Sequence, residues 1–215
     1  MTFITSCPKP TEPTDIPAIT CFEDFGQVVK FGLQYRFSSG STLNQFTISS
    51  ANPNAIASWT ALLEAENSTK VQFSPLVGEP SLPPGDFREA GGGNATPFGI
   101  PKFKGRGHAI FECHLQQQDQ RVAKALKMYE IAPPDLQIYF INEAGLIAGY
   151  VDDKDTPTKF RGFQLSSFRV SDKSLGGYDG IDYNLIQAHL FPNWSDNFYV
   201  VTPSDFDALT ELTGS

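Results

Sequence analysis

The sequence contains few cysteines and no long apolar run, and both shortages narrow the classes of protein it can encode. Its three cysteines, Cys7, Cys21 and Cys113, are an odd number at no spacing typical of a metal site. We interpret them as free thiols of a reducing compartment. No run of about 18 apolar residues occurs, so we expect no membrane-spanning helix and no membrane partner. Residues 1–17 lack a basic region followed by an apolar run, so no signal peptide is predicted.

Basic residues are also in short supply. The chain has 16 Lys and Arg against 24 Asp and Glu, which gives a net charge of −8. Proteins that hold nucleic acid through its phosphates rely on Lys and Arg, so the charge argues against that kind of binding. The charge is compatible with a negative wall past which DNA slides, because such a wall repels the phosphate backbone.

Phenylalanine, glycine and proline are abundant instead. The 18 Phe favour half-buried β-structure, and 18 Gly with 16 Pro predict many turns and some long loops. Apolar residues alternate at spacing two from Val29 to Phe37, which predicts a strand. The turn Asn142–Gly145 between two apolar runs predicts a β-hairpin. Further strands are expected within residues 43–49, 70–77, 107–115, 158–172, 183–191 and 197–202.

Two segments have the apolar periodicity of amphipathic helices. In residues 52–67, Asn52 is the expected N-cap and Trp59 lies on the apolar face. In residues 116–130, Leu126 lies on the apolar face. We therefore predict that Trp59 and Leu126 are buried against a sheet.

Together these elements predict a mainly β (α+β) fold, an antiparallel β-sandwich or barrel with one or two flanking helices. A short terminal helix is also expected over residues 203–212, with Ser204 as its cap. Residues 1–18, rich in Pro and Thr, are interpreted as an extended N-terminal arm, and residues 19–215 as a single domain. Within that domain, residues 78–107 have little periodicity and predict a long Gly/Pro-rich loop. A loop of this length is usually functional or mobile.

No constellation of residues predicts catalysis, cofactor binding or a metal site. The stretch Ala90–Phe103 has three consecutive glycines but lacks the Lys-Ser/Thr pair of a phosphate-binding loop. Cys113 and His114 are adjacent in a predicted strand, so their side chains point to opposite faces and form no catalytic pair. The acidic run Asp152–Asp155 ends in Pro157 and is interpreted as a turn with solvated charges rather than a calcium loop.

Aromatic residues near the two ends of the chain leave open a carbohydrate-binding β-domain, because exposed aromatic rings can form a platform for sugars. The candidates are Phe22, Phe25, Trp194, Phe198 and Tyr199. Such residues lie more often in a core or at a subunit interface.

Six segments carry a likeness to a known family. They are CFEDFGQVVKFGLQYR, WTALLEAENSTKVQFSP, REAGGGNATPFGI, YFINEAGLIAGYVDD, SDKSLGGYDGID and FPNWSDNFYVVTPSDFDAL. Together they resemble virion structural proteins of tailed bacteriophages, above all the major tail (tail-tube) proteins. The likeness covers most of the chain after residue 18 and is one of whole segments, without a diagnostic motif.

The resemblance implies a structural subunit that assembles with copies of itself into stacked hexameric rings, which form the tail tube for DNA ejection. It implies other phage tail proteins as partners and DNA that passes through the lumen without specific binding. It also implies a place in the virion after synthesis in the host cytoplasm. The same likeness fits another tail, neck or baseplate component, or an injection-machine component, that binds partner proteins without polymerising.

In tail-tube proteins, rings stack through a long loop and terminal arms, so the glycine-rich loop is interpreted as an inter-subunit contact. Its glycines let the backbone adapt, its prolines limit the entropy lost on docking, and its phenylalanines supply apolar anchors. We expect residues 1–18 and 78–107 to be poorly ordered in a free subunit and ordered in the polymer. The expected interface residues are Gly91, Gly92, Gly93, Phe98, Pro101 and Phe103.

Overall fold

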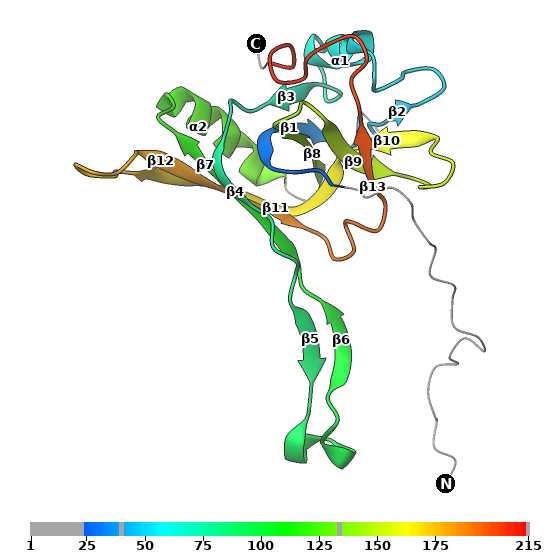
Figure 1. The fold of residues 1–215 in the computed structure, drawn as a ribbon, viewed down its shortest axis with the longest axis vertical. Coiled ribbons are helices and arrows are strands. Elements are labelled where there is room, and N and C mark those ends of the chain that lie inside the picture. The colour runs from blue at the N-terminus through cyan, green and yellow to red at the C-terminus, as the bar shows by residue number, and fades with distance from the viewer. Residues whose placement is uncertain (1–23, 39–40, 133–134, 214–215) are drawn as a thin grey trace.

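The structure, a computed structural model, describes residues 24–38, 41–132 and 135–213 (Figure 1). The strands are β1 (Val28–Tyr35), β2 (Phe46–Thr47), β3 (Val71–Phe73), β4 (Gly78–Ser81), β5 (Phe87–Ala90), β6 (Lys102–Arg106), β7 (Ala109–Gln116), β8 (Leu136–Asn142), β9 (Ile147–Val151), β10 (Lys159–Arg161), β11 (Phe163–Ser174), β12 (Tyr183–Leu190) and β13 (Phe198–Val201). The helices are α1 (Ile56–Leu63), α2 (Gln120–Lys127) and the 3₁₀ segments η1 (Gly93–Ala95), η2 (Pro97–Gly99) and η3 (Met128–Ile131). The predicted mainly β, antiparallel fold with flanking helices is confirmed. The extended N-terminal arm predicted for residues 1–18 lies outside the described residues and is distinct from the hairpin described below.

Within the described part of the chain, eleven strands form one antiparallel sheet that branches at β8. One edge of β8 pairs with β1, and its other edge pairs with β11 near its start and with β9 near its end. The β9 branch continues through β10 to β2 and carries β13, whereas the β11 branch continues through β12 and β7 to β4. The Val77 N–H donates to the Val29 carbonyl at 2.9 Å, just before β4. The second branch therefore returns to β1, and the sheet curls toward a barrel.

Apolar cores form on both faces of β8, whose residues are all buried. Leu136, Ile138 and Phe140 belong to the core that β1, β7, β11 and β12 enclose. Tyr139 and Ile141 belong to a second core, together with residues of α1 and the C-terminal segment. A strand buried on both faces typically has a continuous apolar run rather than an alternating one, as Ile138–Ile141 are here.

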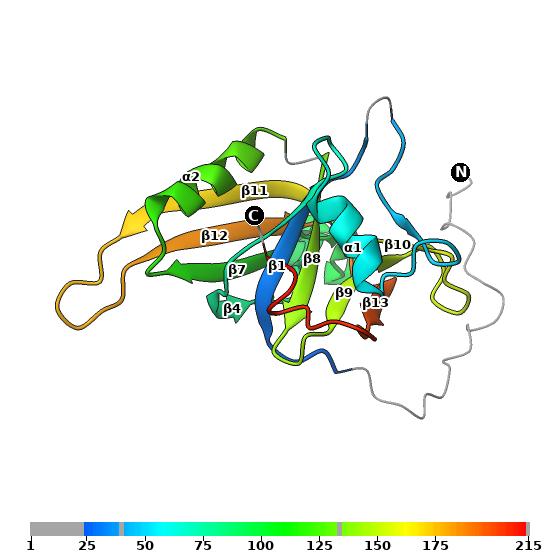
Figure 2. The ribbon, with the colours of Figure 1, turned by 90° about the horizontal axis from the view of Figure 1, so that it is seen from above.

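Helix α1 covers the second core, and Figure 2 shows it lying over β8. Trp59 is fully buried, which confirms the prediction. Its ring centroid lies 4.6 Å from that of Phe46 and 5.3 Å from that of Tyr139, and its Nε1–H donates to the Pro53 carbonyl at 2.8 Å. The indole is therefore packed on several sides and its polar group is satisfied.

The start of α1 differs from the prediction. The helix begins at Ile56, not beside Asn52, and its N-cap residue Ala55 makes no side-chain capping bond. The Ile56 N–H instead donates to the carboxylate of Asp205, 2.9 Å away and 149 positions later in the chain. An N-cap supplied from such a distance leaves no local sequence pattern, so the prediction from Asn52 was wrong.

The short helix predicted for residues 203–212 is also wrong, because this segment contains turns and no helix. Ser204, the expected cap, donates both its N–H and its hydroxyl to the Asn54 carbonyl before α1. The Leu209 carbonyl accepts a hydrogen bond from Lys30 Nζ at 2.9 Å. These long-range bonds tie the segment to α1 and β1 in place of bonds within a helix.

Helix α2 lies along β11 (Figure 2), contributes Ala123 and Leu126 to the core that β1, β7, β11 and β12 enclose, and continues as η3. Asp119 caps it, because its Oδ1 accepts from the Arg121 N–H at 2.8 Å. Leu126 is buried, which confirms the prediction. The predicted hairpin between β8 and β9 is also confirmed, with the Gly145 N–H donating to the Asn142 carbonyl at 3.0 Å.

The prediction of a long loop over residues 78–107 is wrong where the segment forms three short strands. Residues Gly78–Ser81 form β4, which pairs with β7. Strands β5 and β6 pair only with each other and extend away from the rest of the fold as a long hairpin (Figure 1). The alternation in Lys102–Arg106 is short, and the Gly/Pro-rich residues before it belong to the hairpin's tip, so the strand signal is easily missed.

Candidate assembly interface

The hairpin of residues 87–106, here called the arm, is the largest protrusion in the described part of the chain (Figure 1). Its register pairs Phe87 with Arg106 and Ala90 with Lys102, with a bulge between Arg88 and the next residue. All residues of β5 are exposed, as are those of β6 except one half-buried glycine. Among the described residues, the strands of the arm therefore pack on no other element of the subunit.

Close backbone contact holds the root of the arm in place. The Gly107 N–H donates to the Asp86 carbonyl at 2.6 Å, and the two strands leave the body side by side. A Cβ on Gly85 would lie 2.4 Å from the Gly107 oxygen, so only glycine fits there. Arg106 Nη1 donates to Asn193 Oδ1 at 3.3 Å and links the arm to the loop after β12.

The tip of the arm has a defined turn structure made of η1 and η2. Thr96 Oγ1 accepts from the Gly92 N–H at 3.0 Å and donates to the Ile100 carbonyl at 2.8 Å. Gly91 has φ +85°, and a Cβ there would lie 2.2 Å from Thr96 Cγ2, so this position requires glycine. Phe98 has φ 63°, a left-handed conformation that costs energy for a bulky residue.

Large apolar side chains on the arm face solvent. Phe98 at the tip is 97% exposed, and Phe87, Ile100 and Phe103 are each exposed by more than half. The Phe87 and Phe103 rings pack on each other with centroids 6.2 Å apart, and the Arg106 guanidinium lies 5.8 Å from the Phe87 ring. Exposed aromatics gathered in one patch are typical of a surface that another protein covers.

The arm also differs in charge from the rest of the chain. It carries four basic residues and one acidic residue, hence +3, whereas the total is −8. The charged residues are Arg88, Lys102, Lys104, Arg106 and Glu89. A basic, aromatic arm on an acidic body is suited to contact with an acidic surface.

Two further apolar patches are exposed. The turn between β11 and β12 presents Leu175, Tyr178 and Ile181, and Tyr178 is fully exposed. A groove of about 1,280 Å³ lies between α2 and β3, with Leu76 and Met128 at its exposed edges. The subunit therefore offers more than one surface to partners.

All six residues predicted for the interface lie on the arm. Five of them form its tip, and the sixth, Phe103, lies midway along β6. The sequence analysis missed Phe87 and Ile100, which are exposed apolar residues of the same hairpin. The spacing of Phe87 and Phe103 on either side of the glycines was the available signal for a hairpin.

The structure places Cys113 and His114 on opposite faces of β7, as predicted. Cys113 is fully buried, and burial raises the pKa of its thiol. The His114 ring stacks on Tyr183 with centroids 3.9 Å apart, and its Nδ1 lies 3.1 Å from a Glu79 carboxylate oxygen.

A serine–histidine contact that the sequence analysis did not anticipate joins Ser166 and His108, with 3.0 Å between Oγ and Nδ1. The Ser166 hydroxyl donates to the His189 carbonyl at 3.1 Å, and His108 Nδ1 also contacts the Leu190 carbonyl at 3.1 Å. These bonds tether β11 and β12 to the start of β7. A nucleophile would need its hydroxyl proton directed at the histidine, and the bond to the His189 carbonyl uses that proton.

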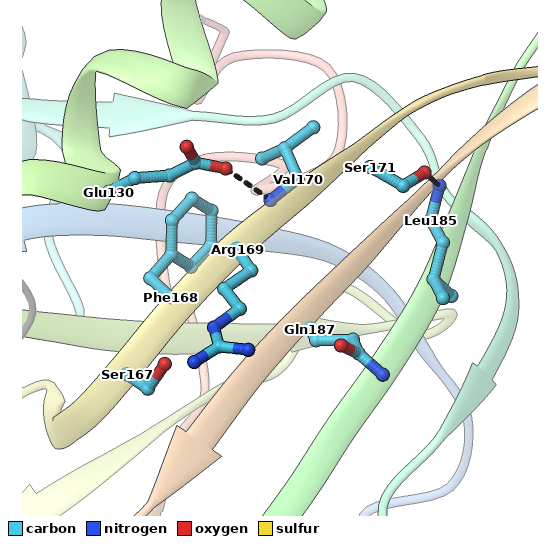
Figure 3. A pocket seen from close by; sticks show the side chains of 8 residues that line it. All are labelled: Glu130, Ser167, Phe168, Arg169, Val170, Ser171, Leu185 and Gln187. Carbon is cyan, nitrogen blue, oxygen red and sulfur yellow. Dashed lines mark hydrogen bonds between the residues drawn. The ribbon is translucent and has the colours of Figure 1, made fainter.

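A shallow pocket of about 550 Å³ lies on β11 and β12 below η3 (Figure 3). Glu130 Oε1 accepts from the Val170 N–H at 2.7 Å, and Ser171 Oγ accepts from the Leu185 N–H at 2.7 Å. Both bonds lie beside the irregular register of β11 and β12, where the ladder leaves N–H groups unpaired. These polar side chains accept hydrogen bonds from backbone N–H groups that the strand pairing leaves unpaired. The residues that line the pocket include no histidine or cysteine.

The acidic turn after β9 is built from hydrogen bonds to its own backbone. Asp152 Oδ1 accepts from the N–H groups of Thr158 and Lys159, and Asp153 Oδ1 accepts from that of Asp155. The hydrogen bonds to the Thr158 hydroxyl and to these N–H groups lower the pKa of Asp152. The described residues include no group of three or more His, Cys, Asp or Glu placed to hold a metal ion.

Three of the aromatic residues considered as a sugar platform, Phe25, Trp194 and Phe198, form a cluster on the first core, whereas Tyr199 packs on the second core. Trp194 and Phe198 pack on the buried Phe163 with centroids 5.1 and 5.7 Å away, and Phe25 packs on Phe198 at 5.7 Å. These rings are half-buried, with the edges of Trp194 and Phe25 turned toward their neighbours. Phe22 lies outside the described residues.

Comparisons of the chain with protein-family models, with curated proteins and with solved structures return no match. None of the helices in the described part of the chain is long and apolar enough to cross a membrane.

Proposed function

We propose that this protein is a structural subunit of a phage tail tube, which assembles with copies of itself into stacked hexameric rings around a channel for DNA. The sequence resemblance to major tail proteins motivates the proposal. The structural observation that carries it is the arm, which holds a fully exposed phenylalanine in a left-handed conformation at its tip. We propose a structural rather than a catalytic role.

The energetics of the arm favour a partner. A two-stranded hairpin is at best marginally stable alone in water, and the part of the subunit that the structure describes offers this one no packing surface. Burying an exposed apolar side chain would contribute about 25 cal/mol of favourable free energy for each Å² of apolar surface removed from water. A neighbouring subunit that covers Phe98, Ile100 and Phe103 would stabilise both the contact and the arm.

The two ends of the molecule have complementary charge. The arm is basic, and residues 202–213 near α1, at the opposite end in Figure 1, contain Asp205, Asp207 and Glu211 but no Lys or Arg. Contact between different surfaces of identical subunits is heterologous and propagates into rings or filaments. Opposite charges at the two ends therefore favour head-to-tail stacking of one copy on the next.

The acidic total charge fits a conduit through which DNA passes without being held. Net charge −8 gives the phosphate backbone little to bind. Other phage tail proteins would meet the tube at its two ends. A tail, neck or baseplate component that binds a different protein would use the same arm without forming a polymer.

Sedimentation velocity of the purified protein over a range of micromolar concentrations tests the proposal. We expect large species for the wild type and a shift toward single subunits for the double variant Phe98→Ser/Phe103→Ser. Ile131→Ser is the matched control, because it removes a largely exposed apolar side chain from η3, outside the arm and the other apolar patches. A wild type that stays monomeric at all concentrations would contradict self-assembly. Equal loss of assembly in the control would contradict the specific role of the arm.

A further inference from the structure

A small pocket beside the root of the arm gathers two arginines and a buried amide. The pocket has a volume of about 200 Å³ and lies between β8, β10, β11 and the loop after β12. Its lining includes Arg36, Arg161, Gln137, Tyr150 and Trp194. This volume is below the roughly 300–1,000 Å³ of pockets for drug-sized ligands, so the pocket suits one small group or one side chain.

Both guanidinium groups are held against aromatic rings. The Arg161 Cζ lies 4.6 Å from the Tyr150 ring centroid, and the Arg36 Cζ lies 5.0 Å from that of Phe37. Among the described residues, neither guanidinium has a carboxylate within 4.0 Å. Stacking fixes the plane of a guanidinium and leaves its N–H edge available for a planar oxyanion.

The charge around Arg36 is incompletely balanced. Burial, followed by the positive charge of Arg161, lowers the pKa of Arg36, and the more distant carboxylate of Asp135 opposes this effect more weakly. Two like charges that line one pocket repel each other, so an anion bound between them would relieve the repulsion.

The third polar group is Gln137, which is fully buried. Its Nε2 donates to Gln34 Oε1 at 2.6 Å and to the Asn44 carbonyl at 2.9 Å, so both amide protons are used. Its Oε1 has no hydrogen-bond donor among the described residues. This oxygen is buried below the surface, so an occupant of the pocket does not reach it, and the two arginines are the groups that meet an anion.

We propose that this pocket binds the carboxylate of an aspartate or glutamate from another polypeptide. Arg36 and Arg161 would donate to the carboxylate. The aromatic walls would cover the short apolar part of the side chain. This inference does not depend on the proposed function, because any protein partner with an exposed acidic segment can supply the group.

Saturation-transfer difference NMR can detect this binding, because it observes the ligand and tolerates a large protein. The probe is N-acetyl-aspartate N-methylamide, and its matched control is the asparagine analogue, which has the same shape without the charge. At constant ionic strength we expect the aspartate probe to bind about tenfold more tightly than the asparagine one, as charge-assisted bonds to arginine require.

Variants locate the binding in the pocket. Arg161→Gln and Arg36→Gln should each reduce binding of the aspartate probe to the level of its asparagine analogue, after circular dichroism has confirmed that they fold. Arg121→Gln, at an exposed arginine on α2, should leave binding unchanged. Equal binding of the two probes, or full binding by both pocket variants, would overturn the proposal. Inorganic phosphate that displaces the probe more effectively than acetate would overturn the carboxylate assignment in favour of phosphate.

Discussion

Replacing Trp59 by alanine should destabilise the fold strongly, because this side chain fills the space between α1 and the sheet. Aromatic side chains bury about 150–250 Å² each, which at about 25 cal/mol per Å² is roughly 4–6 kcal/mol for a whole side chain. The unfolded chain already buries part of this area, and alanine keeps the Cβ. We therefore expect Trp59→Ala to lower the free energy of unfolding by about 3–5 kcal/mol.

The indole N–H contributes separately to the stability of the fold, because it donates a hydrogen bond to the Pro53 carbonyl. Trp59→Phe keeps an aromatic ring but leaves this buried acceptor without its donor, which should cost about 1–3 kcal/mol. The phenylalanine variant should therefore lie between the wild type and the alanine variant.

Urea unfolding followed by far-UV circular dichroism measures both changes. Fluorescence is unsuitable because Trp59 is one of only two tryptophans in the chain. The control is Leu76→Ala, whose exposed side chain should change stability by no more than about 0.5 kcal/mol. The slope of the free energy of unfolding against urea concentration should be the same for the wild type and all variants. A loss below about 1 kcal/mol for Trp59→Ala would refute the packing described for α1.

Three further predictions concern the ordering of two segments on assembly, the binding of DNA, and the dependence of stability on pH. Amide hydrogen exchange in residues 1–18 and 78–107 should be slower in assembled particles than in free subunits, and equal protection in both states would contradict docking of these segments. Free subunits should not retard duplex DNA in a gel-shift assay at about 0.1 M salt, where screening reaches about 10 Å, and micromolar binding would contradict a passive conduit. Hydrogen bonds from Arg121 lower the pKa of Asp119 to about 2. The charge of Asp119 therefore stabilises the fold above the pKa of an unfolded aspartate, about 4, and this stability is lost as pH falls toward 2. The difference in urea midpoint between wild type and Asp119→Asn should shrink over this range, and a constant difference would contradict the assignment.

The central strands could be predicted because their side chains carry the pattern themselves. The continuous apolar run of β8 and the turn at Asn142 place the hairpin, and the periodicity around Trp59 places α1 on the sheet. The cap of α1 could not be predicted, because it comes from Asp205 through a contact that only the folded chain creates. The same contact explains why the C-terminal segment forms no helix.

The arm could be predicted only in part. Its glycines, Phe98 and Phe103 were expected at an interface because of the resemblance to tail-tube proteins and the loop's Gly/Pro-rich composition, and this role stays a prediction. The strands β5 and β6 were missed, because neither packs on a core and the alternation in β6 is too short to mark a strand. The pocket with Arg36 and Arg161 joins residues from distant parts of the chain, so no sequence motif marks it.

The arm's role in assembly can be tested by removing the arm and leaving the body intact. Asp86 and Gly107 are hydrogen-bonded backbone neighbours, so residues 87–106 can be replaced by an Asn-Gly turn that closes the strands at the root. Circular dichroism and the urea midpoint should show that the body of this variant folds like the wild type.

Electron microscopy of the two purified proteins is the most direct measurement. We predict rings and tubes with a regular axial repeat for the wild type, and no stacked tubes for the variant without the arm. Discrete single subunits in wild-type preparations at high concentration, or tubes of normal repeat without the arm, would contradict the account.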